Sequence, residues 1–151
     1  MNIHFLHGTE TGNSEMLCED LEADLGAGFE CSISSLADIK PDELVKDTLY
    51  IFVVSTYGSG DVPATAQAFS GALETRPDLS PVRFAIFGLG DMVFAETFAQ
   101  GSKTLMEQLI ASGAAMVGER GVHDASGGDM PEDVALPWFR DILEKLPETA
   151  T

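Results

Sequence analysis

Basic residues are scarce in this chain. Among its 151 residues, Lys and Arg together number 8 while Asp and Glu number 25, which gives a formal net charge of −17. Nucleic acids and anionic membranes bind basic surfaces, so this balance argues against either of them as a partner. The sequence also has no apolar run of the ~18 residues that a transmembrane helix needs.

Cysteine is scarcer still. The 2 cysteines, Cys18 and Cys31, form neither a CxxC motif nor a disulfide framework. The 3 histidines, His4, His7 and His123, are scattered, so we expect no metal site. The first residues, MNIHFLHGTE, lack the basic start and the cleavage site of a secretory signal. These absences together predict a protein of the reducing cytoplasm.

Short apolar runs alternate with helical patterns along the chain. Hydrophobic residues make up 44% of it, which is enough for a core, and the length fits one domain. We predict strands at residues 2–7, 29–34, 49–55, 82–88 and 115–118, and helices at 13–25, 65–75, 97–112 and 131–146. Pro137 is expected to shorten or kink the last helix. We predict one domain over residues 1–147, with residues 148–151 as a short tail.

The order of the predicted strands follows from the rules for connecting them. Five strands alternating with helices predict an α/β fold, a three-layer sandwich around a five-stranded parallel sheet. Right-handed crossovers and the small size favour the strand order 2-1-3-4-5. In that order a ligand crevice lies beyond the carboxyl ends of strands 1 and 3, where the winding direction reverses.

The loop after the first predicted strand has the composition of a phosphate site. It consists of Thr9, Glu10, Thr11, Gly12, Asn13 and Ser14. It leads into a helix N-terminus, where backbone N–H groups and the helix dipole attract an anion. Without a Lys it is no NTPase P-loop, and without GxGxxG a dinucleotide site is disfavoured. A terminal phosphomonoester held by neutral donors fits this loop; the alternative is that Thr9 and Thr11 only cap the helix.

Two further loops combine glycines with an aromatic residue. They contain Ser55, Thr56, Tyr57 and Gly58 after the third strand, and Gly88, Leu89, Gly90, Asp91 and Phe94 after the fourth. A planar ligand fits against the ring of Tyr57, with the glycines letting backbone amides approach. The alternatives are an ordinary turn with a surface tyrosine, and Phe94 as a core residue. Because all three loops converge on one crevice, they predict a mononucleotide with a large planar head group, such as a flavin.

Together the three loops resemble a known family. GTETGNSE, VVSTYGSGD and FGLGD are similar to the three FMN loops of short-chain flavodoxins and of the FMN domains of diflavin reductases. The stretches RPDLSPVRFAIFGLGD and GDMPEDVALPWF are especially similar to the MioC-type flavodoxins. The resemblance covers nearly the whole chain and implies a flavodoxin-like fold with non-covalently bound FMN.

The resemblance also assigns residues to parts of FMN. It implies that residues 9–14 wrap the phosphate and that residues 55–58 border the ring, with Tyr57 against one face. Residues 88–91 would meet the pyrimidine edge or the other face.

One position departs from the family pattern. The family usually stacks a Tyr on the flavin after the third loop, where Phe94 stands nearest in this chain. The segment 90–98 is one residue longer than usual, so Ala95 is the other candidate for that place. A Phe would keep the stacking surface and lose the hydroxyl.

An electron carrier without catalytic residues is the function that the resemblance implies. The sequence shows no triad, no carboxylate pair and no metal cluster, and His7 beside the first loop is interpreted as structural. The flavin would supply the redox chemistry, passing single electrons between a reductase and an acceptor enzyme. The acidic composition predicts a partner with a basic face, such as an NADPH-dependent flavodoxin reductase, and we expect a monomer.

Three alternatives stay open at this point. An NAD(P)H-linked quinone reductase needs a nicotinamide site, for which no added loop is present. A receiver domain needs an acidic pair after strand 1 and an Asp after strand 3, where His7-Gly8 and Ser55-Thr56 stand. The third alternative is a flavodoxin-like interaction module that has lost its flavin, which the missing Tyr leaves open.

Overall fold

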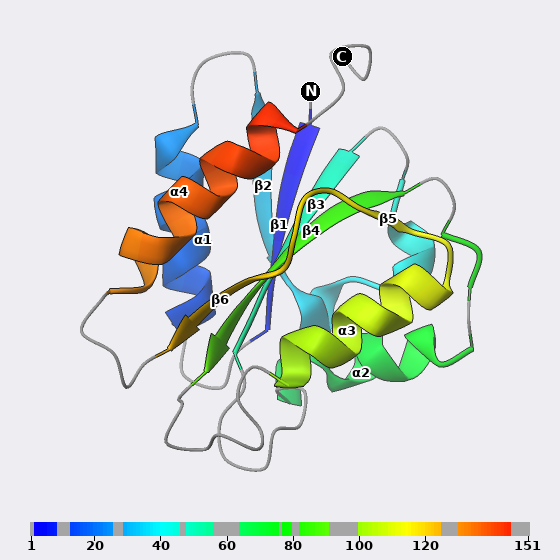
Figure 1. Cartoon of the computed structure of the whole chain (residues 1–151). Helices are drawn as coiled ribbons and strands as arrows, with labels where there is room; N and C mark the ends of the chain where they lie inside the picture. Colours follow the sequence, from blue (N-terminus) through cyan, green and yellow to red (C-terminus); the bar gives the residue numbers. More distant parts are fainter. Residues whose placement is uncertain are drawn as a thin grey trace.

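A computed structural model shows a parallel sheet with helices on both faces (Figure 1). The structure describes residues 2–8, 13–25, 29–45, 48–55, 64–75, 77–79, 82–90, 100–124 and 130–145. Within these ranges, no helix is both long and apolar enough to cross a membrane.

The sheet confirms the predicted strand order. Its strands are β1 (Asn2–Gly8), β2 (Glu30–Ser35), β3 (Thr48–Ser55), β4 (Arg83–Gly90), β5 (Ala115–Met116) and β6 (Gly121–Asp124). They follow the order β2-β1-β3-β4-β5, with β6 also paired to β4, and every pair is parallel. The central strand β3 (TLYIFVVS) is apolar along most of its length because helices cover both of its faces.

The helices form the two outer layers. They are α1 (Asn13–Asp24), α2 (Ala64–Leu73), α3 (Gln100–Ala111) and α4 (Pro131–Glu144), with short 3₁₀ turns η1 (Leu36–Asp38) and η2 (Pro41–Glu43). Helices α1 and α4 cover one face, and α2 and α3 cover the other (Figure 1). Since successive strand residues point to opposite faces, Phe5 packs under α1 and α4 while Leu6 packs under α2 and α3.

The sequence predicts one strand at residues 115–118 beside the fourth strand, but the structure has two short strands there. Two short strands, β5 and β6, occupy one side of β4, so the sheet has six strands in five positions. Gly118 adopts a φ of 70°, a left-handed conformation that ends the first segment. The second segment, GVHD, is too short and too polar to show a strand pattern.

Helix α4 continues through Pro137 and ends at Glu144, two residues before the predicted end at residue 146. The predicted kink at Pro137 stays a prediction. Pro137 is exposed, so the carbonyl that loses its helical donor lies on the outer side of the helix. At the start of α4, the backbone N–H of Met130 donates to Asp133 Oδ2 at 3.1 Å, which closes a capping box.

Candidate functional site

The strands end together at one edge of the sheet. Gly8 of β1 is opposite Val54 of β3, Val54 is opposite Gly88 of β4, and Gly88 is opposite Val122 of β6. One row of paired residues therefore crosses four strands, and each strand ends at that row or within two residues beyond it. The loops that follow these strands thus start from the same edge.

The winding direction reverses between β1 and β3. The chain leaves β1 for α1 on one face and leaves β3 for α2 on the opposite face. Open α/β sheets bind ligands at such a reversal, beyond the carboxyl ends of the strands. Helix α1 starts at Asn13, with four residues between it and Gly8 at the end of β1, so the N–H groups of its first turn lie at this edge.

The donors at this edge fit a phosphate group. The start of a 12-residue helix offers N–H groups without helical acceptors. The sequence of residues 9–12, which lie outside the described ranges, contains two threonines and no Lys or Arg. A phosphate at a helix N-terminus needs no basic side chain, because the amides and the dipole hold it.

Many of the predicted site residues lie outside the described part of the chain. These are Thr9, Glu10, Thr11, Gly12, Thr56, Tyr57, Gly58, Asp91 and Phe94. The structure places Asn13 and Ser14 in the first turn of α1, Ser55 at the end of β3 and Gly90 at the end of β4. The roles assigned to these residues stay predictions.

Gly88 and Leu89 lie near the end of β4, where the side chain of Leu89 turns into the core. Its side chain is 2% exposed and belongs to the core beneath α1 and α4. Only the backbone of Leu89 is therefore left to border the crevice, whereas Gly88 and Gly90 on either side carry no side chain.

His7 adds no positive charge next to the first loop. Its imidazole is buried beside Gly8, and this burial lowers the pKa of His7, although the carboxylates of Glu15, Asp38 and Glu19 act in the opposite direction. The side chain is therefore neutral at pH 7. This agrees with an anion site built from neutral donors.

A fourth strand end lies at this edge, where the sequence predicts no strand. His123 and Asp124 end β6, opposite Leu89 and Gly90. His123 is buried, with 5% of its surface exposed. The segment between β6 and α4 therefore also starts at the candidate site.

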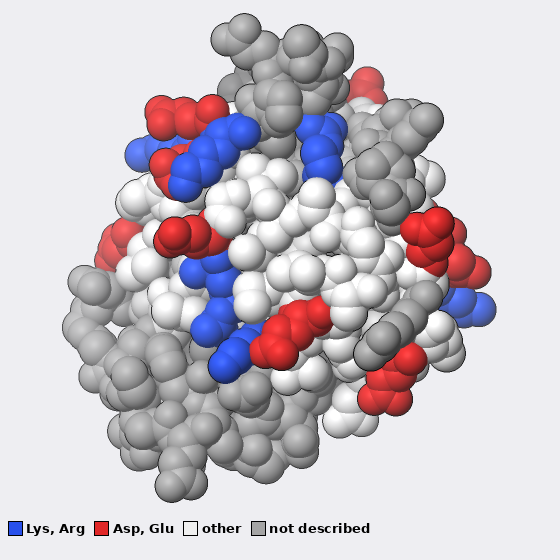
Figure 2. Space-filling model, turned by 45° about the vertical axis from the view of Figure 1, so that its right-hand side comes forward, with Lys and Arg blue, Asp and Glu red and all other residues white. Residues whose placement is uncertain are grey.

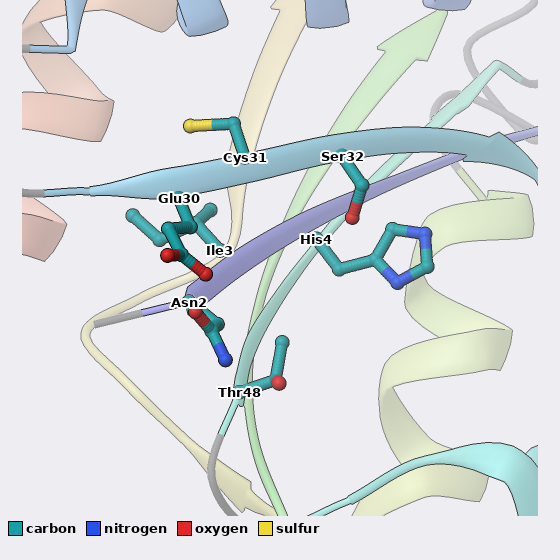
Figure 3. A pocket seen from close by; sticks show the side chains of 7 residues that line it. All are labelled: Asn2, Ile3, His4, Glu30, Cys31, Ser32 and Thr48. Carbon is teal, nitrogen blue, oxygen red and sulfur yellow. The ribbon is translucent and has the colours of Figure 1, made fainter.

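A pocket of about 280 Å³ lies at the opposite edge, at the amino ends of β1, β2 and β3 (Figure 3). In this pocket Cys31 points away from His4 and Glu30, and Ser34 Oγ lies 2.8 Å from His4 Nε2. Within the described ranges, no three His, Cys, Asp or Glu side chains are grouped so that they could bind a metal. This pocket thus lies at the edge of the sheet opposite the one where β1 and β3 end.

The fold defines a class of protein: a doubly wound α/β domain whose winding direction reverses between β1 and β3, the place where mononucleotide-binding proteins of this architecture hold their ligand. The family model for flavodoxin matches residues 6–138. Protein MioC of Escherichia coli K12 is 33% identical over 147 residues, which cover 96% of this chain and 98% of MioC. The chain belongs to the flavodoxin family.

Other relatives and solved structures agree. The sulfite reductase [NADPH] flavoprotein alpha-component of Bacillus subtilis is 34% identical over 95% of this chain, which spans only 23% of that longer protein. A flavodoxin variant from Pseudomonas aeruginosa superposes with a TM-score of 0.80 at 27% identity, covering 97% of this chain and 99% of its own. Oxidised flavodoxin 2 of Bacillus cereus gives a TM-score of 0.82 at 25% identity over 97% of this chain and 100% of its own.

Membership of this family bears directly on the predicted function. Flavodoxins carry electrons on FMN, so the comparisons confirm FMN as the cofactor and electron transfer as the function predicted from the loop motifs. Membership of the flavodoxin family also argues against the receiver-domain alternative.

Proposed function

We propose that this chain is a monomeric carrier that takes single electrons from a reductase and delivers them to an acceptor enzyme. The observation that supports it best is the start of α1 at the winding reversal, where a phosphate is held without a cation. FMN, when bound, supplies the one-electron and two-electron redox chemistry. The protein's own residues bind the phosphate, orient the ring and limit its contact with water.

Each of the three predicted loops has a part in this proposal. Residues 9–14 hold the phosphate through hydroxyls and backbone N–H groups. Residues 55–58 border the ring with Tyr57 against one face, and residues 88–91 contact its pyrimidine edge. Phe94 covers the other face. The neutral state of His7 leaves the start of α1 as the main positive potential near the phosphate.

A reductase with a basic docking face fits this carrier. The net charge of −17 steers a positively charged surface toward it. Relatives support an NADPH-linked source of electrons: the NADPH-dependent diflavin oxidoreductase 1 of Emericella nidulans is 34% identical over 94% of this chain, which spans 23% of that protein. We place the carrier in the cytoplasm, since its cysteines are unpaired.

Anaerobic mixing separates this function from a quinone reductase. The protein reconstituted with FMN is mixed with NADPH alone, then with NADPH and a catalytic amount of a flavodoxin reductase, while the flavin absorbance is followed. We expect bleaching only with the reductase, followed by transfer of electrons to cytochrome c. Rapid bleaching by NADPH alone, with turnover of an added quinone, would contradict the proposal.

A further inference from the structure

The pocket at the amino ends of β1, β2 and β3 has a polar wall. Five of the described residues that line it carry polar side chains: Asn2, His4, Glu30, Ser32 and Thr48. Asn2 is opposite both Glu30 and Thr48 in the sheet, and the other two residues are opposite each other. Residues in register on parallel strands point to the same face, so all five side chains lie on one face of the sheet. Between them, Ile3 and Cys31 point to the other face and pack in the core beneath α1 and α4.

The polar wall begins where the core beneath α2 and α3 ends. Leu6, the next residue of β1 on the same face, is fully buried in that core, and so is Tyr50 of β3. The ring of His4 lies 5.8 Å from the ring of Tyr50 and separates the pocket from the core. Sheet faces that helices cover carry apolar side chains, so the polar residues belong to a hollow of about 280 Å³ beside the core and not to the core itself.

The polar side chains of the pocket have hydrogen-bonding capacity to spare. Within the described ranges, His4 alone among them makes a side-chain hydrogen bond, and Glu30 makes no ion pair. Thr48 is only 8% exposed, yet its hydroxyl bonds to no described residue. Figure 3 shows Glu30 and Asn2 on one side of the pocket and His4 on the other. A nearly buried polar group without a partner costs free energy, and a ligand that reaches it removes this cost.

The charge of the pocket selects the kind of ligand. Among the described residues that line it, Glu30 is the one acidic side chain and there is no Lys or Arg. Burial lowers the pKa of His4, so its imidazole is neutral at pH 7. A single carboxylate favours a ligand with one positive charge, and the described ranges hold no three His, Cys, Asp or Glu side chains grouped to bind a metal ion. The hydroxyls and the amide beside the carboxylate both donate and accept, and they match hydroxyl groups.

We propose that this pocket binds a small hydroxylated primary amine, about the size of one sugar ring. The carboxylate of Glu30 holds the ammonium group, and Ser32 and Thr48 exchange hydrogen bonds with the hydroxyls. The volume of about 280 Å³ is just below the ~300 Å³ at which ordinary small-molecule sites begin, which limits the ligand to a single ring. The pocket lies at the edge of the sheet opposite the flavin crevice, so this binding is independent of the electron-carrier function.

Titration of the isotope-labelled protein with glucosamine, followed by NMR, tests the proposal. Phosphate buffer is used, because Tris is itself a hydroxylated amine and would compete. We expect the backbone signals at the amino ends of β1, β2 and β3 to shift, with a dissociation constant of about 1 mM. Glucose, which lacks the ammonium group, should bind about tenfold more weakly, the value of one charge-assisted hydrogen bond. Nα-acetyl-lysine amide, which has an ammonium group but no hydroxyl, should bind about fivefold more weakly, the value of one neutral hydrogen bond.

Three variants locate the site. Glu30→Gln keeps the shape of an exposed side chain and removes its charge, so it should weaken glucosamine by about tenfold and leave glucose unchanged. Thr48→Val removes a hydroxyl at nearly constant volume and should weaken both sugars by about fivefold. Glu144→Gln is the charge-matched control, since Glu144 is an exposed residue of α4, which covers the opposite face. It should change neither constant, and circular dichroism checks that each variant is folded.

Each contrary outcome identifies the part of the proposal that fails. If glucosamine shifts no signals at the amino ends of these strands, or if folded Glu30→Gln binds it as tightly as the wild type, the proposed site is wrong. Equal affinities for glucosamine and glucose would overturn the role of the charge. Equal affinities for glucosamine and the lysine amide would overturn the hydroxylated class of ligand. The titrations are repeated with FMN present and should give the same constants; a constant that changes with FMN would contradict the independence of the two sites.

Discussion

Two histidines lie in strand β1, His4 half-buried and His7 buried, and the folded protein disfavours the charged form of each. Burial lowers the pKa of His4, whose Nε2 lies 2.8 Å from Ser34 Oγ, and it lowers the pKa of His7 as well. Both imidazoles must therefore gain their protons at a lower pH in the folded chain than in the unfolded chain. Their burial makes folding sensitive to mild acid.

The stability of the apoprotein should fall as the pH drops below about 6.5, the ordinary histidine pKa. As the pH falls through this value, the histidines of the unfolded chain bind protons before those of the folded chain do. The stabilisation that depends on the neutral histidines is therefore complete above this pH and is lost below it. Urea midpoints between about pH 7.5 and 5.5 measure the effect. His4→Gln should show a shallower dependence than the wild type; an unchanged slope would show that His4 makes no contribution.

Substitution by alanine should destabilise the protein at one glycine and stabilise it at another. A Cβ at Gly121 would lie 2.6 Å from Phe87 Cδ2 and 2.8 Å from Trp138 Cδ1, so Gly121→Ala should cost about 1–3 kcal/mol of unfolding free energy. A Cβ at Gly71 in α2 would meet nothing within 4 Å, and Gly71→Ala should gain about 0.5–1 kcal/mol. Chemical denaturation measures both, and a stable Gly121→Ala would show that the two rings can move apart.

The elements that the sequence predicts well are those with a long pattern. The apolar run of β3 and the apolar face of α1, with Leu17 and Leu21 in the core, define their structures locally. By contrast, β6 has four residues and depends on pairing with β4, which is a tertiary effect. Pro137 is tolerated because it lies on the exposed side of α4, and the sequence alone does not reveal which side that is.

Alanine substitutions of two adjacent residues of α4 should differ sharply in their effect on the free energy of unfolding. Phe139 is fully buried against Phe5, with ring centroids 5.6 Å apart, so Phe139→Ala should cost about 3–5 kcal/mol of unfolding free energy. Arg140 lies next to it on the exposed side, and Arg140→Ala should change stability little. Urea denaturation of the apoproteins compares the two; equal losses would mean that α4 does not pack as described.

The candidate site was predicted in part from the sequence. The loop motifs and the strand order together located it, because parallel strands place their carboxyl ends at one edge. That His123 and Asp124 end a strand at this edge was not predicted, because β6 depends on its pairing with β4. The burial of Leu89 was missed too, since a loop motif does not tell which side chain turns into the core.

The whole molecule is strongly acidic. On the face that Figure 2 shows, acidic side chains are spread out, several of them with a basic side chain beside them and an uncharged area between. The surplus of 25 acidic over 8 basic residues therefore acts mainly as a long-range field. Such a field increases the rate of encounter with a basic partner more than the strength of the final contact.

Electron transfer from a basic reductase should therefore slow as salt is added. Stopped-flow measurement of the bimolecular rate constant should show a fall of about tenfold between roughly 10 mM and 300 mM salt, as screening shortens the reach of the field. A rate constant that does not change with salt would show that electrostatic steering does not speed the encounter with the reductase.

If neutral donors at the start of α1 hold the phosphate of FMN, a flavin without the phosphate should bind less tightly. The apoprotein is titrated with FMN and with riboflavin, which differ only in the phosphate. We predict that FMN binds at least about tenfold more tightly than riboflavin, because one charge-assisted hydrogen bond to the phosphate contributes about that factor in affinity. Thr11→Ala and Gly12→Val should reduce the ratio of the two dissociation constants. Equal affinities for the two flavins, or no binding of either, would contradict the account.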